Sequence, residues 1–236
     1  MLKGGCKIGN AKMLEPNSVD VAVGHIIQII ASVSSNTYGG CSAPYLDEVL
    51  IPYVRKTFMK HFFNGYKFFY GSEIDKKEFL YEIGIDYFGS SETWEKVYDF
   101  LEKEYNKVYR YASELTEDSV KQAMQGLEYE INSLSTVNGQ TPFTTIGIGT
   151  SLAREGKLIQ KYVFKTRSAG FGAKKEVAIF PKIVYAVADG INFKPDDPNW
   201  DISQIAFDCM TKSIYPDILF VTKEECLKKT VIYPIK

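Results

Sequence analysis

The stretch Phe143-Thr-Thr-Ile-Gly-Ile-Gly149 indicates the fold class of this 236-residue chain. It is rich in Thr and Ile, the β-branched residues that favour strands. A helical pattern follows over 155–170, and Pro181-Lys-Ile-Val-Tyr-Ala-Val187 then has the composition of a buried strand. Because a helix separates two buried strands, the strands are expected to run parallel. The sequence therefore predicts an α/β architecture with a parallel element.

Helical patterns occur on both sides of this unit. The first is apolar almost all round and is therefore expected to be buried. The predicted helices lie at 17–35, 44–60, 91–111, 116–134 and 202–214, with Thr116 as the N-cap of the fourth and Pro52 as a candidate kink in the second. The stretch 72–85 is predicted to be a small insertion or a hairpin.

Composition and charge argue against several classes of function. The chain has 28 basic and 29 acidic residues, so it has no basic field and no nucleic-acid partner is expected. An apolar run of roughly 18–20 residues is not apparent, nor is a signal peptide, so no membrane contact and a cytoplasmic location are expected. Four widely spaced cysteines and two histidines suggest neither a disulfide framework nor a metal site.

Two runs of small and hydroxylated residues with glycines follow helical segments: Ser34-Ser-Asn-Thr-Tyr-Gly-Gly-Cys41 and Asn132-Ser-Leu-Ser-Thr-Val-Asn-Gly-Gln-Thr-Pro-Phe143. Glycine lets backbone amides approach a ligand without a Cβ clash, and Asn, Gln and Thr exchange hydrogen bonds, so both runs suit an anion or a sugar. The alternatives are a helix C-cap with a turn for the first and an Asn-Gly hairpin for the second. A helix, not a strand, precedes the Asn-Gly pair, which weakens the hairpin alternative.

Isolated candidates carry less weight. Cys41 could be a reactive thiol, but no base or helix N-terminus is evident beside it, so a small packed side chain is predicted, as for the other cysteines. His25 and His61 are predicted to be satisfied core histidines. The turn around Asp196–Asp201 lacks the glycine and glutamate positions of a calcium loop.

Ordered motifs along nearly the whole chain resemble the anaerobic (class III) ribonucleoside-triphosphate reductases, which are glycyl-radical enzymes. The matching motifs are Lys7-Ile-Gly-Asn-Ala, Glu15-Pro-Asn-Ser, 34–41, Ala43-Pro-Tyr-Leu-Asp to Tyr53-Val-Arg-Lys, Gln122-Ala-Met-Gln-Gly-Leu, 132–143, Ile179-Phe-Pro-Lys, Gly190-Ile-Asn-Phe, Asp197-Pro-Asn-Trp-Asp and Tyr215-Pro-Asp-Ile-Leu. The resemblance implies a ten-stranded α/β barrel, of which residues 1–236 would form about half as a single, incomplete domain. Residues 71–90 are the least characteristic part and are a possible insertion.

The resemblance also implies an activity and its partners. The activity is reduction of ribonucleoside triphosphates to deoxyribonucleotides for DNA synthesis, through a glycyl radical and a cysteine thiyl radical. An iron–sulfur, S-adenosylmethionine-dependent activase would install the radical, with formate or a thiol protein as reductant. A deoxynucleoside triphosphate effector would bind near the interface of a homodimer and select the substrate base. A structural zinc would belong to a C-terminal part, and no cofactor is expected within this chain.

The family's binding residues carry over onto two sets of positions. The substrate pocket would contain Tyr38, Gly39, Gly40 and Ser135. The specificity loop, which passes effector identity to the active site, would contain Thr136, Asn138, Gly139, Gln140 and Thr141. The helices at 44–58 and 119–134 would form the effector pocket with the partner subunit.

The sequence departs from the family pattern in the residues that carry the radical. A family strand cysteine would precede Met1, and Cys6 falls too late to replace it. Neither Met-Gly-Cys-Arg nor the glycyl-radical motif occurs, and Cys226 lacks the surrounding motif, so no catalytic residue is assigned. We expect the chain to be inactive alone and to work with a complementing reductase half. The alternative is a non-catalytic, deoxynucleotide-binding dimerisation module.

Overall fold

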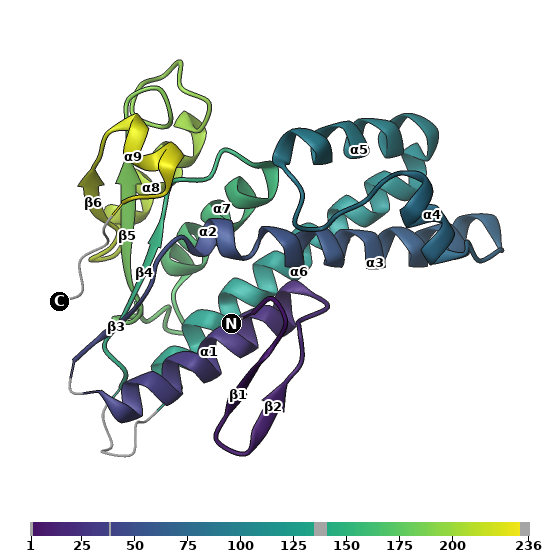
Figure 1. The fold of residues 1–236 in the computed structure, drawn as a ribbon. Helices are drawn as coiled ribbons and strands as arrows, with labels where there is room; N and C mark the ends of the chain where they lie inside the picture. The colour runs from purple at the N-terminus through teal and green to yellow at the C-terminus, as the bar shows by residue number, and fades with distance from the viewer. Residues whose placement is uncertain (1, 38, 135–140, 232–236) are drawn as a thin grey trace.

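A four-stranded parallel sheet organises the computed structural model, which describes residues 2–37, 39–134 and 141–231 (Figure 1). Its strands lie side by side in chain order: β3 (Cys41–Ala43), β4 (Thr144–Ile148), β5 (Lys182–Val187) and β6 (Asp217–Phe220). All three pairings are parallel, which confirms the predicted α/β architecture. Strands β4 and β5 were predicted from the sequence, whereas β3 and β6 were not.

The helices connect the strands and cover the sheet. They are α1 (Val19–Asn36), α2 (Leu46–Val49), α3 (Ile51–Tyr70), α4 (Lys76–Glu82), α5 (Ser91–Glu104), α6 (Asn106–Ser133), α7 (Arg154–Ala169), α8 (Trp200–Met210) and α9 (Lys223–Lys228). The long helix α6 is central, because it packs against α1, α3 and α7. A separate antiparallel hairpin, β1 (Cys6–Ile8) and β2 (Ala11–Met13), precedes α1.

Strand β5 is buried on both faces. Ile183 and Tyr185 belong to the main core with residues of α1, α6, α7 and α8, whereas Val184 and Ala186 pack on the opposite face with Cys226. This two-sided burial explains why the strand is a continuous apolar run and not an alternating one.

A second core lies in an arm built from α3, α4, α5 and α6, which projects from the sheet (Figure 1). It is mostly aromatic: Phe58 and Phe62 of α3 contact rings of the neighbouring helices edge to face, including Tyr98 at 5.1 Å between centroids. Trp94 of α5 is almost fully buried there. The abundance of Tyr and Phe in this part of the chain is therefore accounted for by packing.

Several predicted boundaries were wrong in and around this arm. The predicted helix 44–60 is divided at Leu50, and Pro52 lies in the first turn of α3, where a missing N–H causes no kink. Of the two alternatives given for 72–85, the hairpin is wrong, because the stretch contains helix α4, whose N-terminus is capped by Asp75 accepting hydrogen bonds from the amides of Lys77 and Glu78.

The predicted start of the fourth helix at Thr116 was also wrong. Helix α5 ends at Glu104, and α6 then runs unbroken from Asn106 to Ser133. Thr116 lies inside α6, where its hydroxyl donates to the carbonyl of Ala112 at 2.6 Å instead of capping a terminus.

Helix α1 is long and apolar enough, by length and composition alone, to cross a membrane. An apolar run of this length was not expected from the sequence. However, six of its residues are buried in this fold, among them Val19, Ile27 and Ile30 of the main core. Packing against α6 and α3 accounts for the apolar character of α1.

Candidate functional site

The two glycine-containing runs meet at the amino end of the sheet. Gly39 and Gly40 lead into β3, while Thr141, Pro142 and Phe143 lead into β4. The amide of Cys41 donates to the carbonyl of Phe143 at 2.9 Å, which joins the ends of the two runs directly. Parallel pairing of β3 with β4 then keeps both runs at one edge. Residues more than 90 positions apart in the sequence thus become neighbours.

The structure places three of the predicted site residues at this edge: Gly39, Gly40 and Thr141. The other predicted residues, Tyr38, Ser135, Thr136, Asn138, Gly139 and Gln140, lie outside the described residues. Thr37, which follows the end of α1, is extended and is not a left-handed glycine cap, so the C-cap alternative for the first run is wrong. The Asn-Gly hairpin alternative for the second run lies outside the described residues.

Gly39 has no conformational reason to be glycine within this chain. A Cβ atom built on it would meet no atom of the described residues within 4 Å, apart from its chain neighbours, and its φ lies outside the left-handed region. The residue therefore faces open space. A ligand-binding role for this backbone stays a prediction.

Asn132 and Phe143 hold the two flanks of the second run against Phe180, two residues before β5. The Asn132 side-chain amide donates to the carbonyls of Glu128 and Phe180, and its Oδ1 atom accepts from the amide of Phe180 at 3.4 Å. The ring of Phe143 meets the ring of Phe180 edge to face, with centroids 5.2 Å apart. Both residues lie within motifs noted in the sequence, but neither was assigned this role.

A buried ion pair supports the same edge. Arg167 of α7 pairs through Nε with Glu128 of α6 at 2.5 Å and donates from Nη2 to the carbonyl of Pro181 at 2.7 Å. Burial raises the pKa of Glu128, while the charge of Arg167 and its hydrogen bond oppose that rise. Sequence reasoning missed this pair. The available signal was Arg167 at helical spacing from Val163 and Phe164, which places a charge on an apolar face.

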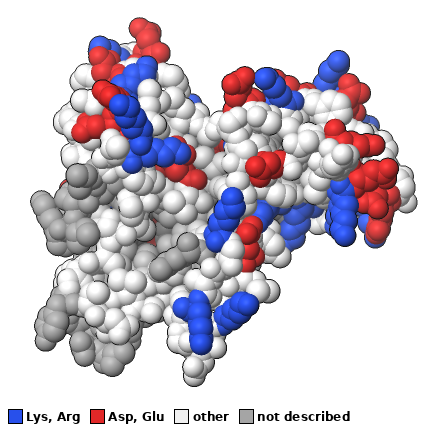
Figure 2. Space-filling model, viewed as in Figure 1, with Lys and Arg blue, Asp and Glu red and all other residues white. Residues whose placement is uncertain are grey.

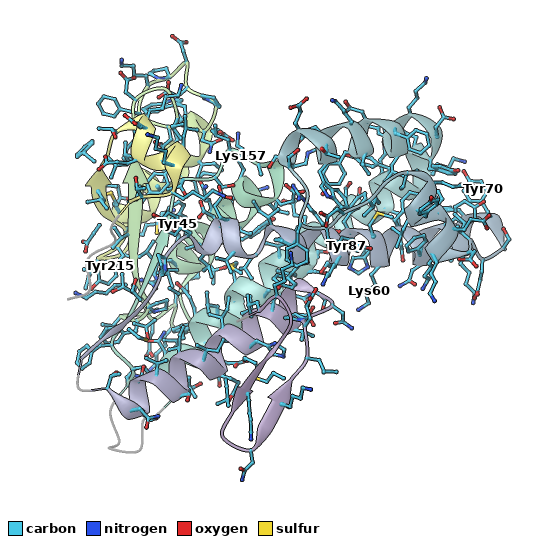
Figure 3. The ribbon with its side chains drawn as sticks, in the orientation of Figure 1. Tyr45, Lys60, Tyr70, Tyr87, Lys157 and Tyr215 are labelled. Carbon is cyan, nitrogen blue, oxygen red and sulfur yellow. The ribbon has the colours of Figure 1, made fainter. Side chains whose placement is uncertain are left out.

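A polar cavity of about 330 Å³ lies among α1, α3 and α6. Its lining includes Asp20 and Gly24 of α1, Lys60 and His61 of α3, and Ser119 and Gln122 of α6. Lys60 projects from α3 (Figure 3) and forms no ion pair with any described residue. The cavity thus combines an unpaired cation with hydroxyl, amide and carboxylate groups.

The two histidines are not in the core, contrary to expectation. His61 is half-buried in the cavity wall, and its Nε2 atom lies 3.1 Å from the hydroxyl of Ser119. Because that hydroxyl donates its single hydrogen to Leu115, His61 Nε2 is the donor. Burial and the charge of Lys60 lower the pKa of His61, so the ring is neutral near pH 7. His25 is likewise only half-buried.

The cysteines are free thiols without a reactive environment. Cys41 packs at the start of β3 with its Sγ atom 3.4 Å from the Ser34 hydroxyl and 3.7 Å from that of Thr144. Burial raises the pKa of Cys226 to about 11, which disfavours the thiolate. Cys209 is fully buried, whereas Cys6 is only half-buried.

Asp47 forms a buried polar network at the carboxyl end of β4. Its Oδ2 atom accepts from the amides of Gly149 at 2.9 Å and Ser151 at 3.2 Å, and from the side chain of Gln160 at 2.7 Å. No cation pairs with it among the described residues, and burial raises its pKa to about 6. This carboxyl positions the loop after β4, and sequence reasoning missed it.

The raised pKa of Asp47 makes the stability of the fold depend on pH. The folded state holds the Asp47 proton up to about pH 6, whereas the unfolded chain releases it near pH 3.8. The contribution of Asp47 to the free energy of unfolding is therefore full below about pH 4 and is lost as the pH rises through 6. The loss amounts to about 3 kcal/mol, at about 1.4 kcal/mol for each pKa unit. We expect Asp47→Asn to remove this dependence in urea titrations at pH 4–7. An equally steep decline in the free energy of unfolding of Asp47→Asn between pH 4 and 7 would contradict this role.

Metal binding finds no support among residues 2–37, 39–134 and 141–231. No group of three or more His, Cys, Asp or Glu side chains in these ranges could hold a metal ion. The resemblance assigns the zinc to a C-terminal part and the iron–sulfur group to the separate activase, so no step is assigned to either within these residues.

Comparison with known proteins identifies the family. A family model described as anaerobic ribonucleoside-triphosphate reductase matches residues 1–233. The chain is 38% identical over 219 residues to the anaerobic ribonucleoside-triphosphate reductases of Salmonella typhimurium and of Enterobacteria phage T4. The match covers 93% of this chain, but 26% and 30% of those proteins, so the chain spans less than a third of their length.

A solved structure supports the fold. The anaerobic ribonucleotide reductase from Thermotoga maritima in complex with dATP and CTP superposes with a TM-score of 0.52 at 13% identity, covering 93% of this chain and 30% of that one. The partial barrel predicted from the sequence is thus confirmed as the fold. Sequence motifs, fold and relatives agree: the chain belongs to the anaerobic ribonucleoside-triphosphate reductase family.

Proposed function

We propose that this chain is the nucleotide-holding portion of an anaerobic ribonucleoside-triphosphate reductase. The observation that carries the proposal is the meeting of the two glycine-containing runs at the amino end of β3 and β4, joined by the bond from Cys41 to Phe143. The ribonucleoside triphosphate would bind there, with the accessible backbone at Gly39 forming part of its floor. The remainder of the reductase would supply the chemistry of ribonucleotide reduction.

The polar cavity among α1, α3 and α6 is the proposed effector site. Lys60 offers a positive charge for a phosphate group, while Ser119 and Gln122 offer hydrogen bonds to a base or sugar. Its volume of about 330 Å³ lies at the small end of ligand pockets. The cavity would therefore enclose only part of a deoxynucleoside triphosphate, which is consistent with a site completed by a second subunit.

The proposed subunit interface involves α6 and α1 more than α3. The first half of α3 is buried within this chain, from Ile51 to Met59, so the predicted interface helix at 44–58 offers little free surface. Helix α6 presents Tyr129, which is 65% exposed, and the face around α1 carries few charges (Figure 2). A homodimer through this face would place α6 of each subunit beside the effector cavity.

Within the proposal, the remainder of the reductase would carry both the glycyl radical, installed by the separate activase, and the cysteine whose thiyl radical would abstract hydrogen from the ribose. The described residues of this chain bind and orient the nucleotide and hold the two runs together. The four free cysteines are consistent with a reducing compartment, and we place the protein in the cytoplasm.

A thermal shift measurement tests the effector site. At a hundredfold excess over its dissociation constant, a deoxynucleoside triphosphate stabilises a folded protein by about 2.7 kcal/mol. For a chain of this size we expect Tm to rise by about 5–10 °C with at least one of dATP, dGTP or dTTP. No rise with any of them, with the protein folded, would contradict the proposal.

The Lys60→Ala variant locates that binding. Loss of a charge-assisted hydrogen bond should weaken nucleotide affinity about tenfold or more without lowering Tm in the absence of nucleotide. Lys103→Ala, on the exposed surface of α5, is the matched control and should bind as the unaltered chain does. Equal affinities in both variants would place the nucleotide elsewhere.

A further inference from the structure

Phe180 contacts both flanks of the segment that carries the predicted specificity loop. On the α6 side, the Asn132 amide donates to its carbonyl and the Asn132 Oδ1 atom accepts from its N–H. On the β4 side, Phe143 packs on its ring at 5.2 Å. The helix end before the segment and the strand start after it are therefore fixed to one residue.

Helix α6 connects this point to the polar cavity. Ser119, Gln122 and Gly126 line the cavity, and so does Glu130, only two residues before Asn132. At 1.5 Å per residue, Asn132 lies about 3 Å along the helix axis from the cavity wall. The helix is unbroken over this length, so a ligand that displaces its wall also displaces Asn132.

The buried pair of Arg167 and Glu128 adds a second link at the same place. Glu128 lies one turn before Asn132 on α6, and Arg167 bonds both Glu128 and the carbonyl of Pro181, next to Phe180. The end of α6 and residues 180–181 are therefore bonded at two points. This arrangement couples a displacement of α6 to both flanks of the segment.

We propose that Asn132 and Phe180 are positioning residues that pass effector binding from the cavity along α6 to the substrate site. The inference rests on the proposed function, because it requires a nucleotide in the cavity and another at the amino end of the sheet. Neither residue needs to touch a nucleotide. Their contribution is to the coupling between the two sites, which is distinct from the affinity of either.

The test measures the dissociation constant of a ribonucleoside triphosphate with and without a deoxynucleoside triphosphate, in the full chain assembled with the rest of a reductase. Allosteric coupling of this kind typically changes affinity about 5–150-fold. The coupling is the ratio of the two dissociation constants, measured without and with the deoxynucleoside triphosphate. We expect Asn132→Ala and Phe180→Ala to bring this ratio to about 1, while each variant keeps its affinity for the deoxynucleoside triphosphate alone. Phe180→Tyr, which retains the ring, should restore coupling. Ser133→Ala, whose hydroxyl donates to the Glu130 carbonyl within α6, is the matched control.

Three outcomes overturn the inference, and they are distinguishable. Unchanged coupling in Asn132→Ala, with nucleotides bound, overturns the inference alone. A lower Tm with both affinities reduced and the ratio preserved assigns Asn132 a purely structural role and also overturns it. Absence of nucleotide binding by the unaltered protein contradicts the proposed function itself.

Discussion

Arg55→Ala is expected to destabilise the chain by about 3–5 kcal/mol, because it leaves the buried carboxylate of Glu155 without its partner. The guanidinium pairs with Glu155 at 2.6 Å, with both side chains at most 3% exposed, and Nη1 donates to the carbonyls of Tyr87 and Gly89. The same Glu155 oxygen accepts from the hydroxyl of Tyr98. These bonds join α3 to α7 and to the connection before α5, so their loss weakens the attachment of the arm to the sheet.

Urea unfolding followed by circular dichroism measures this effect. Lys96→Ala is the matched control, because Lys96 pairs with Glu92 on the exposed surface of α5, with side chains 75% and 82% exposed. The urea midpoint of Lys96→Ala should be unchanged, since exposed ion pairs contribute little to the free energy of unfolding. A loss below about 1 kcal/mol in Arg55→Ala would show that the buried pair does not hold the arm.

Gly39→Val is expected to lower the activity of the assembled reductase about 100-fold while leaving the fold intact, because small misplacements at a substrate site cost about that factor. A Cβ atom at this position meets no atom of the described residues within 4 Å, apart from its chain neighbours, so the change should alter the free energy of unfolding by no more than about 0.5 kcal/mol. It would instead occupy the space through which a nucleotide approaches the backbone.

Anaerobic turnover and substrate affinity, measured beside Tm, separate these effects. Ala11→Val, on the exposed strand β2, adds side-chain carbon atoms away from the two runs and should leave turnover unchanged. Normal turnover in Gly39→Val would mean that this backbone does not line the substrate site.

The sequence predicted the sheet architecture from local signals but could not place contacts made across it. Strand β5 was recognisable because it is buried on both faces and therefore continuously apolar. Strand β3 was not, because three residues beside glycines carry too little pattern to distinguish a short strand from a loop. The unbroken α6 was divided at Thr116 because a residue that can cap a helix can also bond back to the preceding turn.

The candidate site shows the same division. The two glycine-containing runs were identified from composition and order, and their meeting point was not, because the bond from Cys41 to Phe143 depends on the register of β3 with β4. Asp47, Glu128 and Arg167 were missed because their charges look like surface residues until the fold buries them. A charged residue on an otherwise apolar face signals a buried charge, and this signal was not used in the sequence predictions.

The most direct measurement of the central proposal is deoxynucleotide formation under anaerobic conditions by this chain, a polypeptide supplying the remainder of the reductase, and the radical activase. Electron paramagnetic resonance would confirm that a glycyl radical is present in the assembly. The account predicts that ribonucleoside triphosphate is reduced only when this chain is included, and that Gly39→Val removes most of that activity. An assembled complex with the radical in place but no deoxynucleotide product would contradict it.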